Sequence, residues 1–299
     1  MTETRVSPPP STRPQAPADE RLPSDRAVPV TVIKQPSRWP RLDIHELWRF
    51  RGLLGVFIWR DLKVRYKQTL IGAVWAIFQP AFTALVYTLV FGKFAKFPSG
   101  NLPYPIFAFA GVLAWQYFAG ALNVASSSIV SNVPLVTKVY FPRVLLPLAG
   151  VLVPLVDLFL ASWVMVGLMA WFHIWPGLPI LLSPFFILLA LITALGGALI
   201  LSALNVRYRD VAFAIPVFMQ VLPFLSGVPY SLDGVPEKWQ WLLSLNPITG
   251  VVSGWRWSVL DGPQPVLGHL AVSVAVALLL FVAGIAYFRR SEPRFADTI

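Results

Sequence analysis

Six long apolar stretches follow residue 69, separated by short polar segments. Each meets the requirement of about 20 predominantly apolar residues for a helix that crosses the hydrocarbon core of a bilayer. We therefore predict six transmembrane helices, at 70–92, 105–129, 142–172, 178–203, 211–230 and 264–288. The third stretch exceeds one crossing, so we expect its beginning to project from the membrane or to tilt. Several prolines lie inside these spans, which is tolerated where neighbouring helices satisfy the freed carbonyls.

Residues 43–67 show the pattern of an amphipathic helix. Asp43 and Glu46 form a capping pair typical of a helix N-terminus. Five apolar side chains recur at three- and four-residue spacing and share one face: Leu47, Phe50, Leu54, Phe57 and Ile58. Basic residues and two tryptophans make up most of the remainder, which favours a helix along a membrane surface over a helix of a soluble domain.

The stretch "SNVPLVTKVYFPR" at 131–143 lies between the second and third spans. Ser131 or Asn132 can cap a helix, and Pro134 suits its first turn. Phe141 precedes Pro142, so the helix is expected to break there. The pattern predicts a short rigid helix at 133–141.

The segment 229–262 contains four tryptophans and two apolar patches, divided by Asn246 and Pro247. Each patch is too short to span a membrane. Such segments are typical of short re-entrant or interfacial helices. We expect this structure on the outer side, before the last span.

Composition agrees with a membrane protein: 56% of the 299 residues are hydrophobic and 13% are charged. The fold class is therefore an all-α polytopic membrane protein. Residues 1–40 differ, because they are rich in Pro, Ser and charge and predict a disordered tail. The absence of cysteine excludes disulfides and thiolate chemistry. The net charge of +10 suggests nucleic acid at first, but in so hydrophobic a chain it fits loops that set orientation and meet anionic lipid.

The distribution of Lys and Arg predicts that both termini are cytoplasmic. With the N-terminus inside, fourteen basic residues of 41–294 lie on the inner side. The outer side holds four, which are Lys93, Lys96, Lys238 and Arg256. This is a clear positive-inside bias. The 131–141 segment then faces the cytoplasm, and 291–299 forms a cytoplasmic C-terminal tail.

The motifs of several enzyme classes are missing. No Gly-x-x-x-x-Gly-Lys-[Ser/Thr] sequence occurs, so the chain has no P-loop ATPase site of its own. The three histidines lie far apart in the sequence, which argues against a metal site. No nucleophile elbow or clustered acid pair is present. We expect a chain without catalytic residues, metal or cofactor.

Asp157 is the only formal charge between Arg143 and Arg207, and it falls in the middle of the third span. An acid at this depth is a functional candidate. The favoured interpretation is structural: a bond to a hydroxyl or amide of a neighbouring helix, or a protonated carboxyl at a packed contact. An ion-coupled carrier is the alternative, although such carriers usually show more than one intramembrane charge and an inverted repeat.

Four motifs together resemble the permease subunits of polysaccharide-exporting ABC transporters of the O-antigen, capsule and teichoic acid type. They are "RDLKVRYKQTLIGAVWAIFQP" at 60–80, "NVPLVTKVYFPR" at 132–143, "NVRYRD" at 205–210 and "LNPIT" at 245–249. The resemblance covers 45–290, and the Pro-rich extension departs from it. It implies an exporter domain at 41–290, a homodimer of this chain, and two copies of a separate ATPase that binds ATP and Mg²⁺.

The resemblance also implies roles for individual segments. Residues 43–67 correspond to the interface helix, 133–141 to the coupling helix that docks into the ATPase, and 229–262 to outer gate helices. The coupling candidates are Pro134, Leu135, Val136, Lys138, Tyr140, Phe141 and Arg143. The outer gate candidates are Trp239, Trp241, Asn246, Pro247 and Trp255.

The resemblance makes the expected substrate a lipid-linked polysaccharide, exported across a bacterial cytoplasmic membrane. Aromatic side chains on which sugar rings could stack are Tyr87, Trp115, Tyr117, Phe118 and Trp163; packing against lipid or neighbouring helices is the alternative for each. The basic residues Arg60, Lys63, Arg65 and Lys67 could bind the lipid phosphate or simply meet headgroups. An ABC exporter of a drug or lipid would have the same architecture and is the second alternative.

Overall fold

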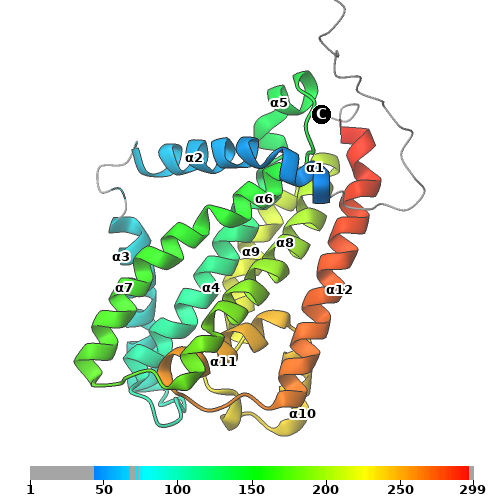
Figure 1. Ribbon diagram of the computed structural model, residues 1–299. Coiled ribbons are helices and arrows are strands. Elements are labelled where there is room, and N and C mark those ends of the chain that lie inside the picture. Colours follow the sequence, from blue (N-terminus) through cyan, green and yellow to red (C-terminus); the bar gives the residue numbers. More distant parts are fainter. Residues whose placement is uncertain (1–43, 68–71, 73, 296–299) are drawn as a thin grey trace, which may run out of the picture. The chain divides into compact units, whose positions relative to one another are not determined.

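The computed structural model describes residues 44–67, 72 and 74–295, and these form helices joined by short connections, without a β-sheet (Figure 1). Five helical stretches are long and apolar enough to cross a membrane: Val74–Phe94, Tyr104–Ser127, Leu145–Phe172, Leu178–Arg207 and Leu267–Arg294. The prediction of an all-helical polytopic membrane protein is thereby confirmed. The predicted tail 1–40 and the proposed cap Asp43 lie outside the described residues.

The fifth predicted span, 211–230, forms a helix of only 15 residues, α9 (Val211–Leu225). This is shorter than the ~20 residues that a perpendicular crossing requires. The helix stops because Pro223 is followed by a turn in which Gly227 has a φ of +67° and the Val228 N–H donates to the Pro223 carbonyl at 3.1 Å. Glycine adopts this left-handed conformation without steric cost.

The third span is interrupted as its excess length requires. It comprises α6 (Leu145–Leu152) and α7 (Pro154–Phe172), which meet at Val153. Pro154 takes the first position of α7, where its missing N–H costs nothing. The first span also changes its helical geometry: α3 (Val74–Tyr87) is α-helical and continues as the π-helical segment η1 (Thr88–Phe94).

Helix α4 (Tyr104–Ser127) is the centre of the bundle. It packs against α3, α6, α7, α9, α11 (Pro247–Leu260) and α8 (Ser183–Arg207, preceded by η3, Leu178–Leu182). In the most apolar 18 consecutive residues of α4, 78% of the residues are buried. The corresponding share is 11% in Val74–Phe94 and 17% in Leu267–Arg294. The outer helices therefore present their apolar side chains to lipid or to another subunit, and α4 faces protein.

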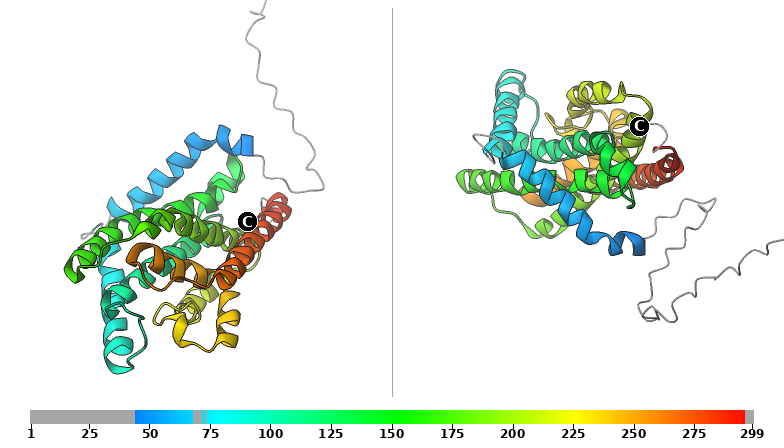
Figure 2. Two further views of the ribbon diagram at one scale, coloured as in Figure 1. Left: turned by 60° about the horizontal axis from the view of Figure 1, so that its bottom comes forward. Right: turned by 90° about the horizontal axis from the view of Figure 1, so that it is seen from above.

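The predicted amphipathic helix is two helices, α1 (Ile44–Arg49) and α2 (Arg51–Lys67). Figure 1 shows α2 lying across the ends of the long helices, and Figure 2 shows the same crossing from above. Its predicted apolar face packs on the protein core: Phe57 is 4% exposed, and Phe50, Leu54 and Ile58 pack around it. The exposed apolar residues Trp48, Val56, Trp59 and Val64 lie elsewhere on the helices.

The opposite end of the bundle carries η4 (Leu232–Gly234), α10 (Glu237–Ser244) and α11 (Figure 1). Helix α12 (Leu267–Ser291) then returns along α8 and ends in η5 (Glu292–Arg294). Phe295, expected in a C-terminal tail, is 2% exposed and packs edge-on against Phe288 at 5.3 Å.

Two glycines allow α8 and α12 to pack closely. A Cβ at Gly284 would lie 2.4 Å from the Gly196 carbonyl oxygen, and a Cβ at Gly196 would lie 2.7 Å from the Phe281 nitrogen. Both contacts involve backbone, which cannot move aside. Small residues at such crossings are what let membrane helices approach each other.

We predict that Gly284→Val separates α8 from α12 and destabilises the protein by about 1–3 kcal/mol, the usual cost of overpacking. The measurement is the thermal unfolding midpoint of the purified protein in detergent. Gly167→Val is the control, because a Cβ at Gly167 in α7 meets nothing within 4 Å. Equal midpoints for the two variants would contradict the prediction.

Candidate functional site

A large cavity, here called the central cavity, lies among α3, α4, α7, α9 and the end of α2. Its volume is about 740 Å³. Five uncharged polar side chains line it: Gln79, Thr83, Gln116, Asn123 and Gln220. Gln116 donates through Nε2 to the Thr83 hydroxyl at 3.3 Å, which links α4 to α3. Amides with spare hydrogen-bonding capacity suit a ligand that carries many hydroxyl groups.

Aromatic side chains share this lining, and three of the five predicted on the sequence are among them: Tyr87, Trp115 and Tyr117. The ring of Tyr87 lies between those of Phe91 and Phe224, with ring centroids 5.4 Å and 6.4 Å apart. The two remaining candidates do not line the cavity. Phe118 packs in the core beside Trp115, and Trp163 is 64% exposed on the outer face of α7.

Asp157 also borders the central cavity, and its partners are now known. It lies in the first turn of α7, where the Arg65 guanidinium contacts its Oδ2 at 2.5 Å and the Tyr66 hydroxyl donates to its Oδ1. The Tyr66 contact agrees with the bond to a hydroxyl of a neighbouring helix that the sequence favoured, and Arg65 is a further partner that the sequence analysis did not name. The sequence hid the pair because Arg65 comes from α2, which crosses above the span rather than lying within it. Burial and the adjoining carboxylate raise the pKa of Tyr66, so this phenol stays protonated.

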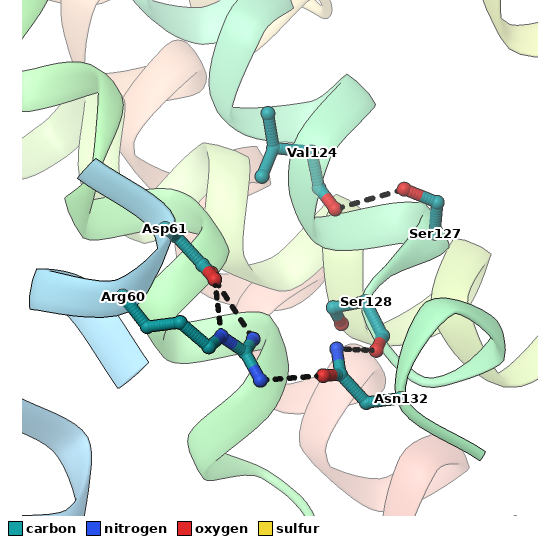
Figure 3. Close-up of polar contacts among 6 residues, drawn as sticks. All are labelled: Arg60, Asp61, Val124, Ser127, Ser128 and Asn132. Atoms are coloured by element: carbon teal, nitrogen blue, oxygen red, sulfur yellow. Dashed lines mark hydrogen bonds and ion pairs between the residues drawn. The ribbon is translucent and has the colours of Figure 1, made fainter. Parts of the chain in front are cut away.

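A second cavity of about 520 Å³, here called the serine-lined cavity, lies between α2 and the end of α4. Ser127, Ser128, Ser131 and Asn132 supply its polar lining. Figure 3 shows Arg60 between Asp61 and Asn132, and all three residues line this cavity. The Nε and Nη2 of Arg60 both lie 2.8 Å from Asp61 Oδ1, and its Nη1 donates to Asn132 Oδ1 at 2.8 Å (Figure 3).

These pairings divide the predicted basic cluster. Arg60 is neutralised by Asp61, and Arg65 is neutralised by Asp157. Lys63 and Lys67 are exposed. Of the four residues of this cluster, these two lysines can meet an external anion without first breaking one of these ion pairs.

The segment 130–144, here called the α5 segment, contains η2 (Val130–Asn132) and α5 (Val133–Lys138). The predicted helix 133–141 thus ends three residues early. Val139 is extended, and Phe141 turns inward to lie 4% exposed against Phe57, with ring centroids 5.6 Å apart. Helix α5 begins after Asn132 as expected, but the Asn132 side chain bonds Arg60 and the Ser128 carbonyl instead of capping.

The other predicted residues of the α5 segment differ in exposure. Val136 is buried at 3% and Leu135 is half-buried, whereas Pro134, Lys138 and Tyr140 are exposed. The Tyr140 hydroxyl lies 3.5 Å from Glu46 of α1, and the charge of Glu46, with some burial, raises the Tyr140 pKa.

The end of the α5 segment is held by the C-terminal helix. Arg143 donates from Nη1 to the Glu292 carbonyl at 2.7 Å, and its backbone N–H donates to Glu292 Oε1 at 3.2 Å. Glu292 also pairs with Arg289 at 3.2 Å. The segment is therefore fixed to α2 at one end and to α12–η5 at the other.

The predicted outer segment is more buried than an interfacial helix would be. Asn246 caps α11 by accepting from the Ile248 N–H at 3.2 Å, and Pro247 takes the first position. Trp255 is 7% exposed, so it belongs to the core. Trp239 and Trp241 on α10 are half-exposed, and Trp241 contacts His269 edge-on at 4.5 Å.

Arg256 on α11 is 5% exposed and lies among backbone carbonyls. It donates to Phe107 at 3.1 Å, to Gly227 at 2.8 Å and to Val228, and its guanidinium stacks over the Phe107 ring. No carboxylate of the described residues lies within 4 Å of it. Arg256, which the sequence analysis counted among the basic residues of the outer side, is thus a buried charge held by backbone carbonyls.

Sequence reasoning missed most of the polar lining. The amides Gln79, Gln116 and Gln220 each lie inside an apolar stretch, and that position was the available signal. A single amide in an apolar stretch is a weak signal, because it carries no charge and does not interrupt a span. The role of Glu292 had no signal in the sequence, because folding brings it to Arg143, 149 positions away, whereas Asp61 pairs with its sequence neighbour Arg60.

Comparison with known proteins gives consistent relatives. Residues 52–260 match the family model described as ABC-2 type transporter. The chain is 29% identical over 259 residues to the O-antigen export system permease protein RfbA of Myxococcus xanthus, covering 86% of this chain and 98% of that protein. It is 27% identical over 256 residues to the RfbA of Klebsiella pneumoniae, covering 83% and 95%.

A more distant relative is the polysialic acid transport protein KpsM of Escherichia coli, 23% identical over 241 residues and covering 78% of this chain and 91% of that protein. The family match includes α2, the α5 segment, both cavities and α11. The chain belongs to the ABC-2 type transporter family of integral membrane proteins.

Proposed function

We propose that this chain is the permease half of an ATP-driven exporter that moves a lipid-linked polysaccharide across the bacterial cytoplasmic membrane. The names of the relatives supply the substrate class, since they are O-antigen export permeases and a polysialic acid transport protein. The observation that carries the proposal is the central cavity. Its amides match sugar hydroxyls, and its aromatic rings offer flat apolar faces to sugar rings.

The energy comes from a separate subunit in this proposal. The sequence has no P-loop, so a partner ATPase binds the ATP and Mg²⁺. Two copies of this chain form a homodimer and two copies of the ATPase attach to it. The most exposed apolar helices, such as α3, are available for contacts with lipid and with the second copy.

The α5 segment is the proposed ATPase contact. Pro134, Lys138 and Tyr140 present exposed side chains to the partner, and Val136 and Phe141 anchor the segment from inside. Its movement passes to α2 through Arg60–Asn132 and to α12 through Arg143–Glu292. Rigid elements linked in this way move together, which is how small shifts at one site become helix displacements elsewhere.

Orientation and the membrane contacts follow from charge. The basic ends of α2, α8 and α12 lie on the cytoplasmic side together with both termini, and α2 is the interface helix. Lys63 and Lys67 contact anionic headgroups or the lipid phosphate of the substrate. Helices α10 and α11 form the outer gate, with Trp239 and Trp241 at the membrane boundary.

An ion-coupled carrier is disfavoured by the pairing of Asp157. A carboxylate that carries protons or ions should be free to change its charge, whereas Asp157 is bound by a guanidinium and a phenol. An exporter of a drug or lipid remains the alternative within the same family. The two are distinguished by the substrate that stimulates the ATPase of the reconstituted complex.

We predict that Lys138→Glu weakens binding of the ATPase subunit about tenfold, because it reverses a charge on the exposed side of α5. The measurement is co-purification of the tagged permease with its candidate ATPase. Lys238→Glu is the matched control, since it reverses an exposed charge on α10 at the other end of the bundle. Equal recovery of the ATPase with both variants would argue against the α5 contact.

We also predict that Tyr87→Leu lowers polysaccharide export about two- to tenfold, the factor expected from one lost aromatic contact. Export is measured as surface polysaccharide in cells whose own permease is deleted. Tyr287→Leu is the control, because Tyr287 lies on α12 outside the central cavity. Unchanged export by Tyr87→Leu at equal protein level would remove the central cavity from the proposed path.

A further inference from the structure

The central cavity and the serine-lined cavity adjoin each other. Arg65 and Val124 line both of them. The serine-lined cavity lies on the α5 side, beside Asn132, and the central cavity extends from there along α3, α4 and α7. The Arg65 side chain therefore lies where the two cavities meet.

The contact at this point joins two separate helices. Arg65 comes from the last turn of α2, and Asp157 comes from the first turn of α7. The Arg65 Nη2 lies 2.5 Å from the Asp157 Oδ2, and the Tyr66 hydroxyl donates to the other carboxylate oxygen. The Arg65 side chain is 39% exposed and that of Asp157 is 18% exposed. One partner is therefore accessible from the cavity, and the other is the more buried.

The burial of the two partners sets how readily this pair opens. An unpaired carboxylate in a poorly hydrated site is costly, so the pair stays closed unless something holds its members apart. Its exposed position keeps the cost of opening modest. These are the properties of a contact that can open and close during a transport cycle.

Helix α2 also connects this ion pair to the α5 segment. Arg60, which bonds Asn132 of the α5 segment, precedes Arg65 by five residues on α2, or about 7.5 Å along the helix axis. A displacement of the α5 segment that pulls on Arg60 shifts Arg65 as well, because both belong to one rigid helix. Figure 3 shows the Arg60–Asn132 end of this linkage.

We propose that Arg65, Tyr66 and Asp157 form a latch that closes the passage between the two cavities, and that movement of α2 with the α5 segment opens it. The inference rests on the proposed function, because it treats the two cavities as successive parts of one path. In this inference Asp157 controls access to the path and does not carry a proton or an ion. These three are positioning residues.

The test uses the natural absence of cysteine in this chain. Gln116→Cys places one thiol in the central cavity, and a membrane-impermeant maleimide is added to the α5 side in inverted membrane vesicles. In the background of Asp157→Asn we expect this thiol to react about fivefold faster or more, as loss of a partly exposed ion pair implies. Ser131→Cys in the serine-lined cavity is the control, and it should react equally in both backgrounds.

Two further backgrounds separate a latch from a contact that only stabilises the fold. Tyr66→Phe removes one hydroxyl and should raise the labelling rate less than Asp157→Asn. The exchange Arg65→Asp with Asp157→Arg restores an ion pair and should return labelling towards the original rate. Thermal unfolding of each protein in detergent shows whether it is folded.

The outcomes are distinct. Labelling of the Gln116→Cys thiol at the same rate in all folded backgrounds would overturn the latch, and so would labelling that follows unfolding temperature alone. Neither labelling result bears on the proposed function, because the labelling experiment requires no ATPase and no substrate. Conversely, a failure of the unmodified chain to export polysaccharide would overturn the proposed function while leaving the labelling result intact.

Discussion

The structure depends on where polar side chains can be placed in a chain made largely of hydrocarbon. Within a bilayer, amides and charges must face other protein groups or water, because lipid offers them no hydrogen bonds. The five amide and hydroxyl side chains of the central cavity satisfy this constraint by facing inward from α3, α4 and α9. The outward surfaces of α3 and α12 are left almost wholly apolar. The cavity is thus a consequence of the same rule that keeps the helices in the membrane.

Helix α4 makes this arrangement possible because neighbouring helices cover most of its surface. One side of it lines the central cavity through Gln116 and Asn123, and another packs on α8 and α11. Its end is fixed by Asn205 of α8, which donates to the Ser126 carbonyl at 3.1 Å. Helix α2 meets the bundle mainly through α6, which packs on α4 and α8, and its last turn also contacts Asp157 of α7.

Most helix positions were predictable from the sequence, and the exceptions have physical causes. Apolar length located the five long helices, and Asn246–Pro247 marked the start of α11 correctly. Helix α9 was overestimated because its apolar run continues beyond Pro223 into a turn that only backbone geometry reveals. The partners of Asp157 and Asn132 could not be foreseen, since both bond to arginines of a helix that crosses the bundle at its end. Periodicity shows which face of α2 is apolar, but it does not show what that face covers.

Arg256 bears on how parts of the fold depend on one another. A guanidinium exposed to hydrocarbon costs several kcal/mol, and this one is compensated by carbonyls of α4 and of the turn at 227–228. Helix α11 buries this arginine against α4, where the Phe107 carbonyl accepts from it and Gly111 leaves room for it. One side chain thus makes the burial of α11 depend on α4 and on the turn at 227–228, so these three segments stabilise one another.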